Sequence, residues 1–110
     1  MAQADRAGRV LRVLAEPHRV RILMLTRTRE LRAGDIARHF RTTRSAISQH
    51  LRVLIKAGLL SERRSGTRRL YRLRPEGFAG LRSFLSTFWD SRLARLKDEA
   101  EAESRSRHVR

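Results

Sequence analysis

The chain has 110 residues, of which 26 are Lys or Arg and 11 are Asp or Glu, so its formal net charge at neutral pH is +15. Hydrophobic residues make up 40% of the sequence, and the lack of cysteine excludes disulfides, thiolate metal ligands and a cysteine nucleophile. No apolar run approaches the roughly 18 residues that a membrane span needs. We therefore expect a single domain over residues 1–110, with its core at about 5–102, that is cytoplasmic and has no membrane partner.

The positive charge is concentrated in the middle of the chain. Between Leu31 and Trp89 there are 13 cations and three acids, which is an excess of ten positive charges. A bound polyanion relieves the mutual repulsion of such charges and releases counterions, so nucleic acid is the expected partner. The alternative is that arginine covers every surface of this protein, and only the positions of the cations can decide between the two.

Three segments in the first half of the sequence have helical periodicity. Val10, Leu11 and Leu14 predict a helix over 5–14. The pair Glu16-Pro17 predicts the start of a second helix that runs to about Thr28, because proline is well tolerated at the first helical position. A third helix is expected over 33–40, although a glycine near its start weakens it.

The segment that follows Thr43 carries the sharpest signal. Thr43 is expected to cap a helix from Arg44 to about Ala57, with Gly58 just beyond its end. At 100° per residue, apolar residues occupy one side of this helix and polar residues the other. The apolar side carries Ile47, Leu51 and Leu54, and the polar side carries Ser45, Ser48, Gln49, Arg52 and Lys56. The helix should therefore be anchored on one side and present hydroxyls, an amide and cations on the other.

The rest of the chain predicts a hairpin and a last helix. Residues 59–64 and 68–73 are expected to form two strands joined by a turn at 65–67. Four arginines flank this turn, namely Arg63, Arg64, Arg68 and Arg69. After the break at 75–77, apolar residues at spacings of three and four predict one long helix to about Ala102, and 103–110 is expected to be a frayed tail.

Four helices, a basic two-stranded hairpin and a closing helix make a mainly α (α+β) winged helix-turn-helix. The second helix of such a pair has the width to enter the major groove of double-stranded DNA. We expect Arg44, Ser45, Ser48 and Gln49 nearest the bases, next to Thr43, and Arg52 and Lys56 nearer the phosphates. The hairpin arginines would reach the backbone or an adjacent minor groove.

The apolar stripe of the first and last helices is wider than one small domain can cover, and a large exposed patch of this kind normally has a partner. The sequence therefore predicts a homodimer. Its expected interface consists of Val10, Leu11, Leu14, Phe84, Leu85, Phe88, Trp89 and Leu93. A twofold dimer would place two recognition helices about 34 Å apart on a palindromic site.

Four segments together resemble the ArsR family of bacterial transcriptional repressors, over residues 11–96. They are LAEPHRVRIL at 14–23, GDIARHF at 34–40, TRSAISQHLRVLIKAGLL at 43–60 and RRSGTRRLYRL at 63–73. The resemblance implies a homodimer that joins through its first and last helices and represses transcription from an inverted-repeat operator, often at its own promoter.

The chain departs from the metal-sensing members of that family, which carry a thiolate pair in a segment reading ELCxCDL. Residues 30–36 have Arg32 and Gly34 at the ligand positions, which excludes that site. A site on the last helix is also not expected, because Arg92 stands where a histidine would be needed beside Asp90, and His108 lies in the tail. We expect no metal, no cofactor and, without a phosphate loop or catalytic triad, no enzyme activity.

Two other functions remain open at this stage. The winged helix could be a protein-interaction module whose charge serves only RNA or nonspecific DNA, or the protein could coat the chromosome without base preference. The effector is unknown, and both a small hydrophobic effector between the first and last helices and control by protein abundance alone stay open.

Overall fold

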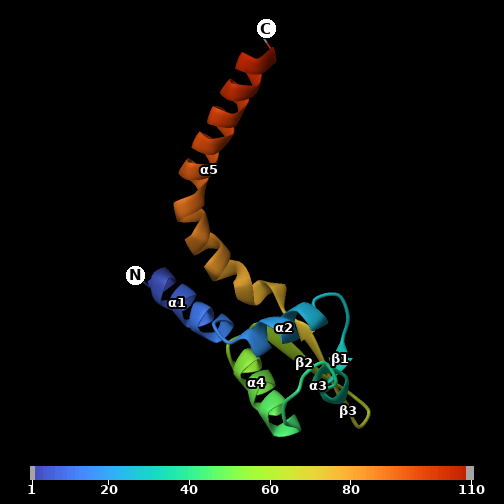
Figure 1. Cartoon of the computed structure of the whole chain (residues 1–110). Coiled ribbons are helices and arrows are strands. Elements are labelled where there is room, and N and C mark those ends of the chain that lie inside the picture. Colours follow the sequence, from blue (N-terminus) through green and yellow to red (C-terminus); the bar gives the residue numbers. More distant parts are fainter. Residues whose placement is uncertain (1, 109–110) are drawn as a thin grey trace.

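The computed structural model describes the backbone of residues 2–108, and their side chains except those of Asp90, Ser91, Leu93, Ala94 and 105–108. Leu93, predicted at the dimer interface, therefore lies outside the described side chains. The helices are α1 (Ala2–Leu14), α2 (Pro17–Thr26), α3 (Ala33–Ala37), α4 (Arg44–Lys56) and α5 (Ala79–His108), with a 3-10 helix η1 (Pro75–Phe78). The strands are β1 (Leu31–Arg32), β2 (Leu60–Ser65) and β3 (Arg68–Leu73) (Figure 1).

Side-chain caps and glycines set the ends of the two helices at the centre of the fold. The Glu16 carboxylate accepts a hydrogen bond from the backbone amide of His18, and Pro17 occupies the first position of α2, as predicted. The Thr43 hydroxyl accepts from the amide of Ala46 at 3.0 Å and starts α4 at the predicted residue. Gly58, with φ of 79°, turns the chain out of α4.

The hairpin is part of a three-stranded antiparallel sheet in the order β1-β3-β2. Leu31 lies opposite Tyr71, and Leu60 lies opposite Leu73, so one face of the sheet carries the buried side chains. The two-residue turn at 66–67 has Gly66 at φ of 64°, which suits a tight hairpin. The strand β1 was not predicted, because two residues are too short to show an alternating pattern.

The core lies where α2, α3, α4 and the sheet meet. Ile22, Ile36, Ile47, Leu54 and Leu59 are completely buried there. The apolar side of α4 is buried as predicted, and the sheet contributes Leu31, Leu60 and Tyr71. This packing holds α4 by one side and leaves its other side on the surface.

Three predicted boundaries are wrong. The helix expected over 33–40 ends at Ala37, and turns bonded from His39 to Ile36 and from Phe40 to Ala37 take its place. The second helix ends at Thr26, two residues early. The last helix continues to His108, so the segment expected to fray from residue 103 is helical, since it has no Gly or Pro and is rich in Ala, Glu and Arg.

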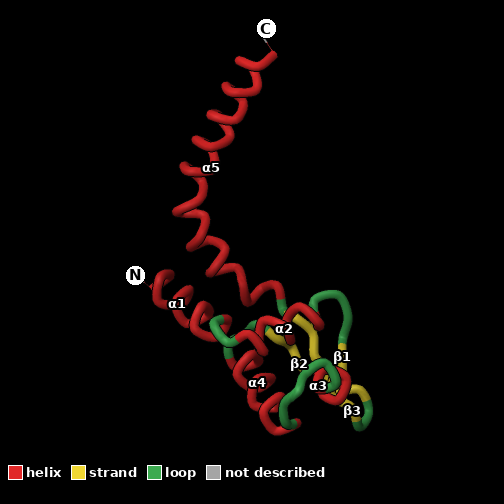
Figure 2. Tube along the Cα trace, in the orientation of Figure 1, coloured by secondary structure: helices red, strands yellow, loops and turns green. Residues whose placement is uncertain are grey.

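The long helix α5 projects away from the rest of the fold, and α1 packs beside its first turns (Figures 1 and 2). The molecule is 66 Å long, of which the 30 residues of α5 account for about 45 Å. None of the helices in the described part of the chain is both long and apolar enough to cross a bilayer.

Candidate nucleic-acid interface

The outer side of α4 carries the predicted row of polar side chains. Ser45, Gln49, Arg52 and Lys56 are exposed, and Ser48 is half-buried. Ile47, Leu51 and Leu54 on the opposite side are buried. The periodicity therefore placed every one of these residues on the correct side of the helix.

The first residue of α4 lies differently from its neighbours on the helix. A Cβ atom built at Gly34 would lie 3.5 Å from Nη1 of Arg44, so the Arg44 guanidinium extends over α3. Thr43 uses its hydroxyl to cap the helix. Both residues thus fix how α4 begins, beside the two serines and the glutamine that follow.

The four arginines at the tip of the β2–β3 hairpin are not equivalent. Arg63 donates two hydrogen bonds of 2.9 Å to the carboxylate of Glu30, and Arg69 forms a 3.4 Å ion pair with Glu62. Arg64 and Arg68 make no ion pair with any side chain that the structure describes. The charge that the hairpin offers to a ligand therefore comes mainly from Arg64 and Arg68.

The ion pair between Glu30 and Arg63 joins the loop before β1 to the hairpin. The hydrogen bonds from Arg63 lower the pKa of the Glu30 carboxyl from its usual 4.5. Sequence reasoning missed this pair because its members are 33 residues apart. The bridge fixes the base of the hairpin relative to α3.

A hollow of about 510 Å³ lies between the hairpin tip, α3 and the start of α4. Arginines surround it from all three elements, namely Arg32, Arg38, Arg44, Arg68 and Arg69. The one acid in its wall, Asp35, is paired with Arg32 at 3.3 Å and with Arg38 at 3.7 Å. Guanidinium groups in such an arrangement favour a phosphate, to which arginine can donate two parallel hydrogen bonds.

Arg32 and Arg38 were not among the predicted DNA-binding residues. They belong to the basic middle of the sequence, but only the fold brings them next to Arg44 and Arg68. The excess of cations was the one available signal, and it did not separate these two from other exposed arginines.

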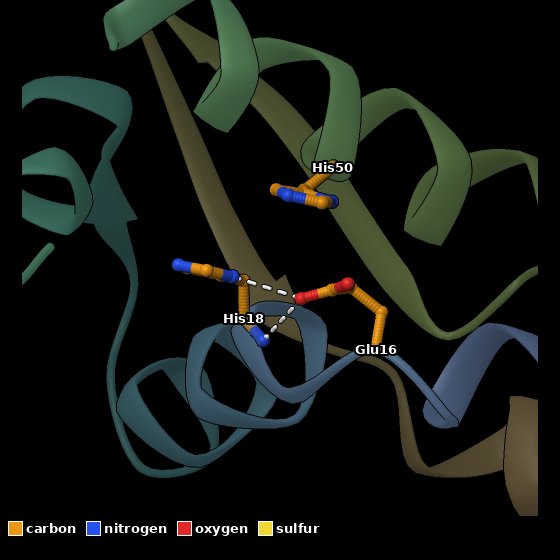
Figure 3. A group of neighbouring side chains, drawn as sticks. All are labelled: Glu16, His18 and His50. Atoms are coloured by element: carbon orange, nitrogen blue, oxygen red, sulfur yellow. Dashed lines mark hydrogen bonds and ion pairs between the residues drawn. The ribbon is translucent and has the colours of Figure 1, made fainter. Parts of the chain in front are cut away.

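Glu16, His18 and His50 form a cluster between α2 and α4 (Figure 3). Nδ1 of His18 lies 2.8 Å from the Glu16 carboxylate, and the two imidazoles stack at 5.5 Å between ring centroids. Arg19 donates from Nε to Nδ1 of His50 at 3.3 Å. Burial lowers the pKa of His50 from 6.5, so its imidazole is held neutral against α2.

This cluster is the one group of potential metal ligands found among the described residues, with its ligand atoms within 4.8 Å of one another. The imidazole planes are 7° from parallel, so their in-plane lone pairs do not converge on one point. The Arg19 guanidinium also places a positive charge against His50. The cluster suits a hydrogen-bonded brace for α4 better than a metal site, which agrees with the structural role expected for His50.

The predicted dimer residues form an apolar strip on α1 and α5. Leu11, Leu85, Phe88 and Trp89 are exposed, with 58% of Phe88 and 51% of Trp89 accessible. Val10, Leu14 and Phe84 are half-buried, and Phe84 packs edge-on against Phe88 at 5.1 Å between ring centroids. Within one chain this strip is left uncovered.

Comparisons with known proteins agree with this geometry. The family model described as bacterial regulatory protein, arsR family, matches residues 16–62, from the cap of α2 into β2. The HTH-type transcriptional regulator Rv2034 of Mycobacterium tuberculosis is 49% identical over 59 residues, or 54% of this chain and 55% of that protein. The transcriptional repressor SdpR of Bacillus subtilis is 39% identical over 57 residues, or 52% and 63%. The chain thus spans between about half and two thirds of the length of these two relatives.

A solved structure extends the match to most of the fold. The homodimeric winged helix-turn-helix DNA-binding domain of Mb0332 from Mycobacterium bovis, a possible ArsR-family transcriptional regulator, is 32% identical with a TM-score of 0.64. The alignment covers 81% of this chain and 82% of that one. The relatives are named as regulators and not as enzymes, which confirms the prediction of no catalytic function. By sequence, fold and helix geometry, the chain belongs to the ArsR family of bacterial regulatory proteins.

Proposed function

We propose that this protein is a homodimeric, cytoplasmic transcriptional repressor that binds an inverted-repeat operator in double-stranded DNA. The observation that carries the proposal is the placement of α4, whose apolar side is buried while its polar side is exposed beside the arginine-lined hollow. Its relatives named as transcriptional repressors support the same function.

Different parts of the interface would make different contacts. Ser45, Ser48 and Gln49 suit base edges in the major groove, where glutamine can bond adenine through two atoms. Arg44 was expected near the bases, but its position over Gly34 favours a phosphate. Phosphate contacts would come from Arg44, Arg52, Arg64 and Arg68, together with Arg32 and Arg38.

The apolar strip on α1 and α5 supports the homodimer. Exposed aromatic side chains such as Phe88 and Trp89 are enriched at protein interfaces. The relative Mb0332 has a homodimeric DNA-binding domain of the same fold. Two copies joined through this strip would present two α4 helices to the two halves of an inverted repeat.

Selection of genomic fragments by the purified protein, followed by titration of the selected site, tests the proposal. We expect one recurring inverted repeat, found also in the protein's own promoter if the repressor regulates itself. Gln49→Ala should lose about 1–3 kcal/mol of discrimination at one base position in each half-site. Gln3→Ala, which changes an exposed glutamine at the far end of α1, serves as the matched control.

Two results would contradict the proposal. Equal competition by the selected fragment and by scrambled DNA at moderate salt would indicate a nonspecific nucleic-acid-binding module. A monomer that associates only with a different protein would indicate an interaction module, whose basic charge has another purpose.

A further inference from the structure

A second hollow lies on the other side of the molecule, where α1, the last turn of α4 and the start of α5 meet. Its volume is about 690 Å³, which falls within the range of small-molecule sites. Val10 and Val13 of α1, Val53 of α4 and Leu81 of α5 contribute apolar surface to it. We call this hollow the α1–α4–α5 groove.

Cations surround the groove, and no acid lines it. They are Arg6, Arg9, Arg12, Arg19 and Lys56. Arg19 is fixed by its bonds to the carbonyl of Val13 and to His50, whereas the other four make no ion pair within the described part of the chain. An apolar floor inside a ring of positive charge fits a molecule with an apolar body and an anionic group.

DNA does not fit this site as well. A duplex offers phosphates but no apolar body to cover the three valines. Lys56, assigned to phosphate contact by the sequence, lies at the end of α4 opposite to Arg44 and faces the arginines of α1. The two ends of α4 are about 18 Å apart, so the groove is separate from the proposed DNA contacts at Arg44.

The walls of the groove belong to elements that also set the position of α4. Val53 and Ala57 come from α4, and Gly77 and Gly80 come from η1 and α5. Gly77 packs directly against the carbonyl of Gly58, and the Arg74 amide donates to the Leu59 carbonyl at 2.8 Å. A ligand here would contact both the helix proposed to read DNA and the base of the helix proposed to join the dimer.

We propose that the α1–α4–α5 groove binds an amphipathic carboxylate, with an apolar chain or ring on the valines and its carboxylate among the arginines. Its occupation shifts α4 relative to α5 and thereby changes the affinity for DNA, a step that depends on the proposed function. A ligand changes an equilibrium only by contacting the two states differently, and this groove spans the junction that would move.

Calorimetric titration of the full chain with decanoate tests the binding step. We expect one site per chain, at least about tenfold weaker binding of 1-decanol and acetate, and shifts of the methyl signals of Val10, Val13 and Val53. The double substitution of Arg9→Ala and Arg12→Ala should weaken decanoate about tenfold or more, by removing charge-assisted bonds. Arg27→Ala, at an exposed arginine outside the groove, should leave it unchanged.

Three results would overturn the binding step: no binding of decanoate, equal binding of 1-decanol, or equal binding by the arginine variant. Contacts between these valine methyls and a second copy of the chain would show that the dimer fills the groove, and would also overturn it.

The regulatory step is tested separately, by titrating operator DNA with and without saturating decanoate. An affinity change of about fivefold or more supports it, and a smaller change overturns it. Failure of the proposed repressor function would instead appear without decanoate, as an absence of preference for the selected fragment.

Discussion

Thr43 controls how α4 begins, because its hydroxyl accepts the hydrogen bond of the Ala46 amide. We expect Thr43→Ala to lower the free energy of unfolding by about 1 kcal/mol, the usual cost of losing such a cap. Denaturant titration measures it. Thr43→Ser should retain most of the stability, and Thr42→Ala, at an exposed threonine that caps no helix, should have little effect. Equal losses from the two alanine substitutions would contradict this role.

Gly77 is required for close packing between η1 and the end of α4. A methyl group there would overlap the carbonyl group of Gly58. We expect Gly77→Ala to lower the free energy of unfolding by about 1–3 kcal/mol, the usual range for an overpacked site. Gly8→Ala is the matched control in α1, where a Cβ meets nothing within 4 Å. This control should gain up to about 1 kcal/mol from helix propensity, and a stabilised Gly77→Ala protein would disprove the contact.

His50 makes stability depend on pH near neutrality. Burial, followed by the nearby charge of Arg19, lowers its pKa below 6.5 in the folded protein, while Glu16 acts against this shift and His18 adds to it. The unfolded chain therefore binds a proton at higher pH than the folded chain does. The stability contributed by neutral His50 is fully present above pH 6.5 and is lost as the pH falls from 6.5 toward the lower folded pKa.

Urea titrations at several pH values between 7 and 5 measure this loss. The slope of unfolding free energy against pH should become smaller in His50→Gln. His39→Gln, which changes an exposed histidine, should keep the slope of the original protein. An unchanged slope in the His50 variant would mean that another group titrates in this range.

At the scale of elements, local sequence was sufficient for α4 but not for its surroundings. The cap at Thr43, the end near Gly58 and the two sides of the helix follow from signals within 16 residues of one another. The two-residue β1 exists only because β3 pairs with it. The end of α3 and the continuation of α5 depend on tertiary packing and on small propensity differences, which periodicity does not resolve.

The parts of the site that sequence could not predict are contacts between distant residues. Arg32 and Arg38 reach the hollow only because α3 packs beside the hairpin, and Arg44 lies over Gly34 for the same reason. The ion pair of Arg63 with Glu30 makes one of four neighbouring arginines different from the others. A list of cations along the chain contains no information about these pairings.

That difference predicts unequal roles for two hairpin arginines in DNA binding. Arg68→Ala should reduce the slope of log affinity against log salt by about 0.9 for a lost phosphate contact. Arg63→Ala should reduce it less, because the Glu30 carboxylate already neutralises that guanidinium. Glu30→Gln, which keeps the shape but removes the charge, should raise the contribution of Arg63. Equal slopes in the two arginine variants would contradict the assignment.

At the scale of the whole molecule, the proposed repressor depends on the apolar strip that one chain leaves exposed. Phe88 is mostly accessible, so Phe88→Asp should change the stability of a single chain little. In a dimer the same side chain would be buried, and an unpaired carboxylate there would be costly. We expect light scattering to give twice 12.8 kDa for the original protein and 12.8 kDa for the variant.

The same substitution should separate the strength of one half-site contact from the effect of joining two. Affinity for an inverted repeat should fall by about 10²–10⁴-fold when the link between two α4 helices is lost, while affinity for a single half-site should change little. Met24→Asp is the control, because Met24 is also exposed and apolar but lies on α2, outside the strip. A dimeric Phe88→Asp protein, or one that still binds the full repeat tightly, would show that the two copies meet through another surface.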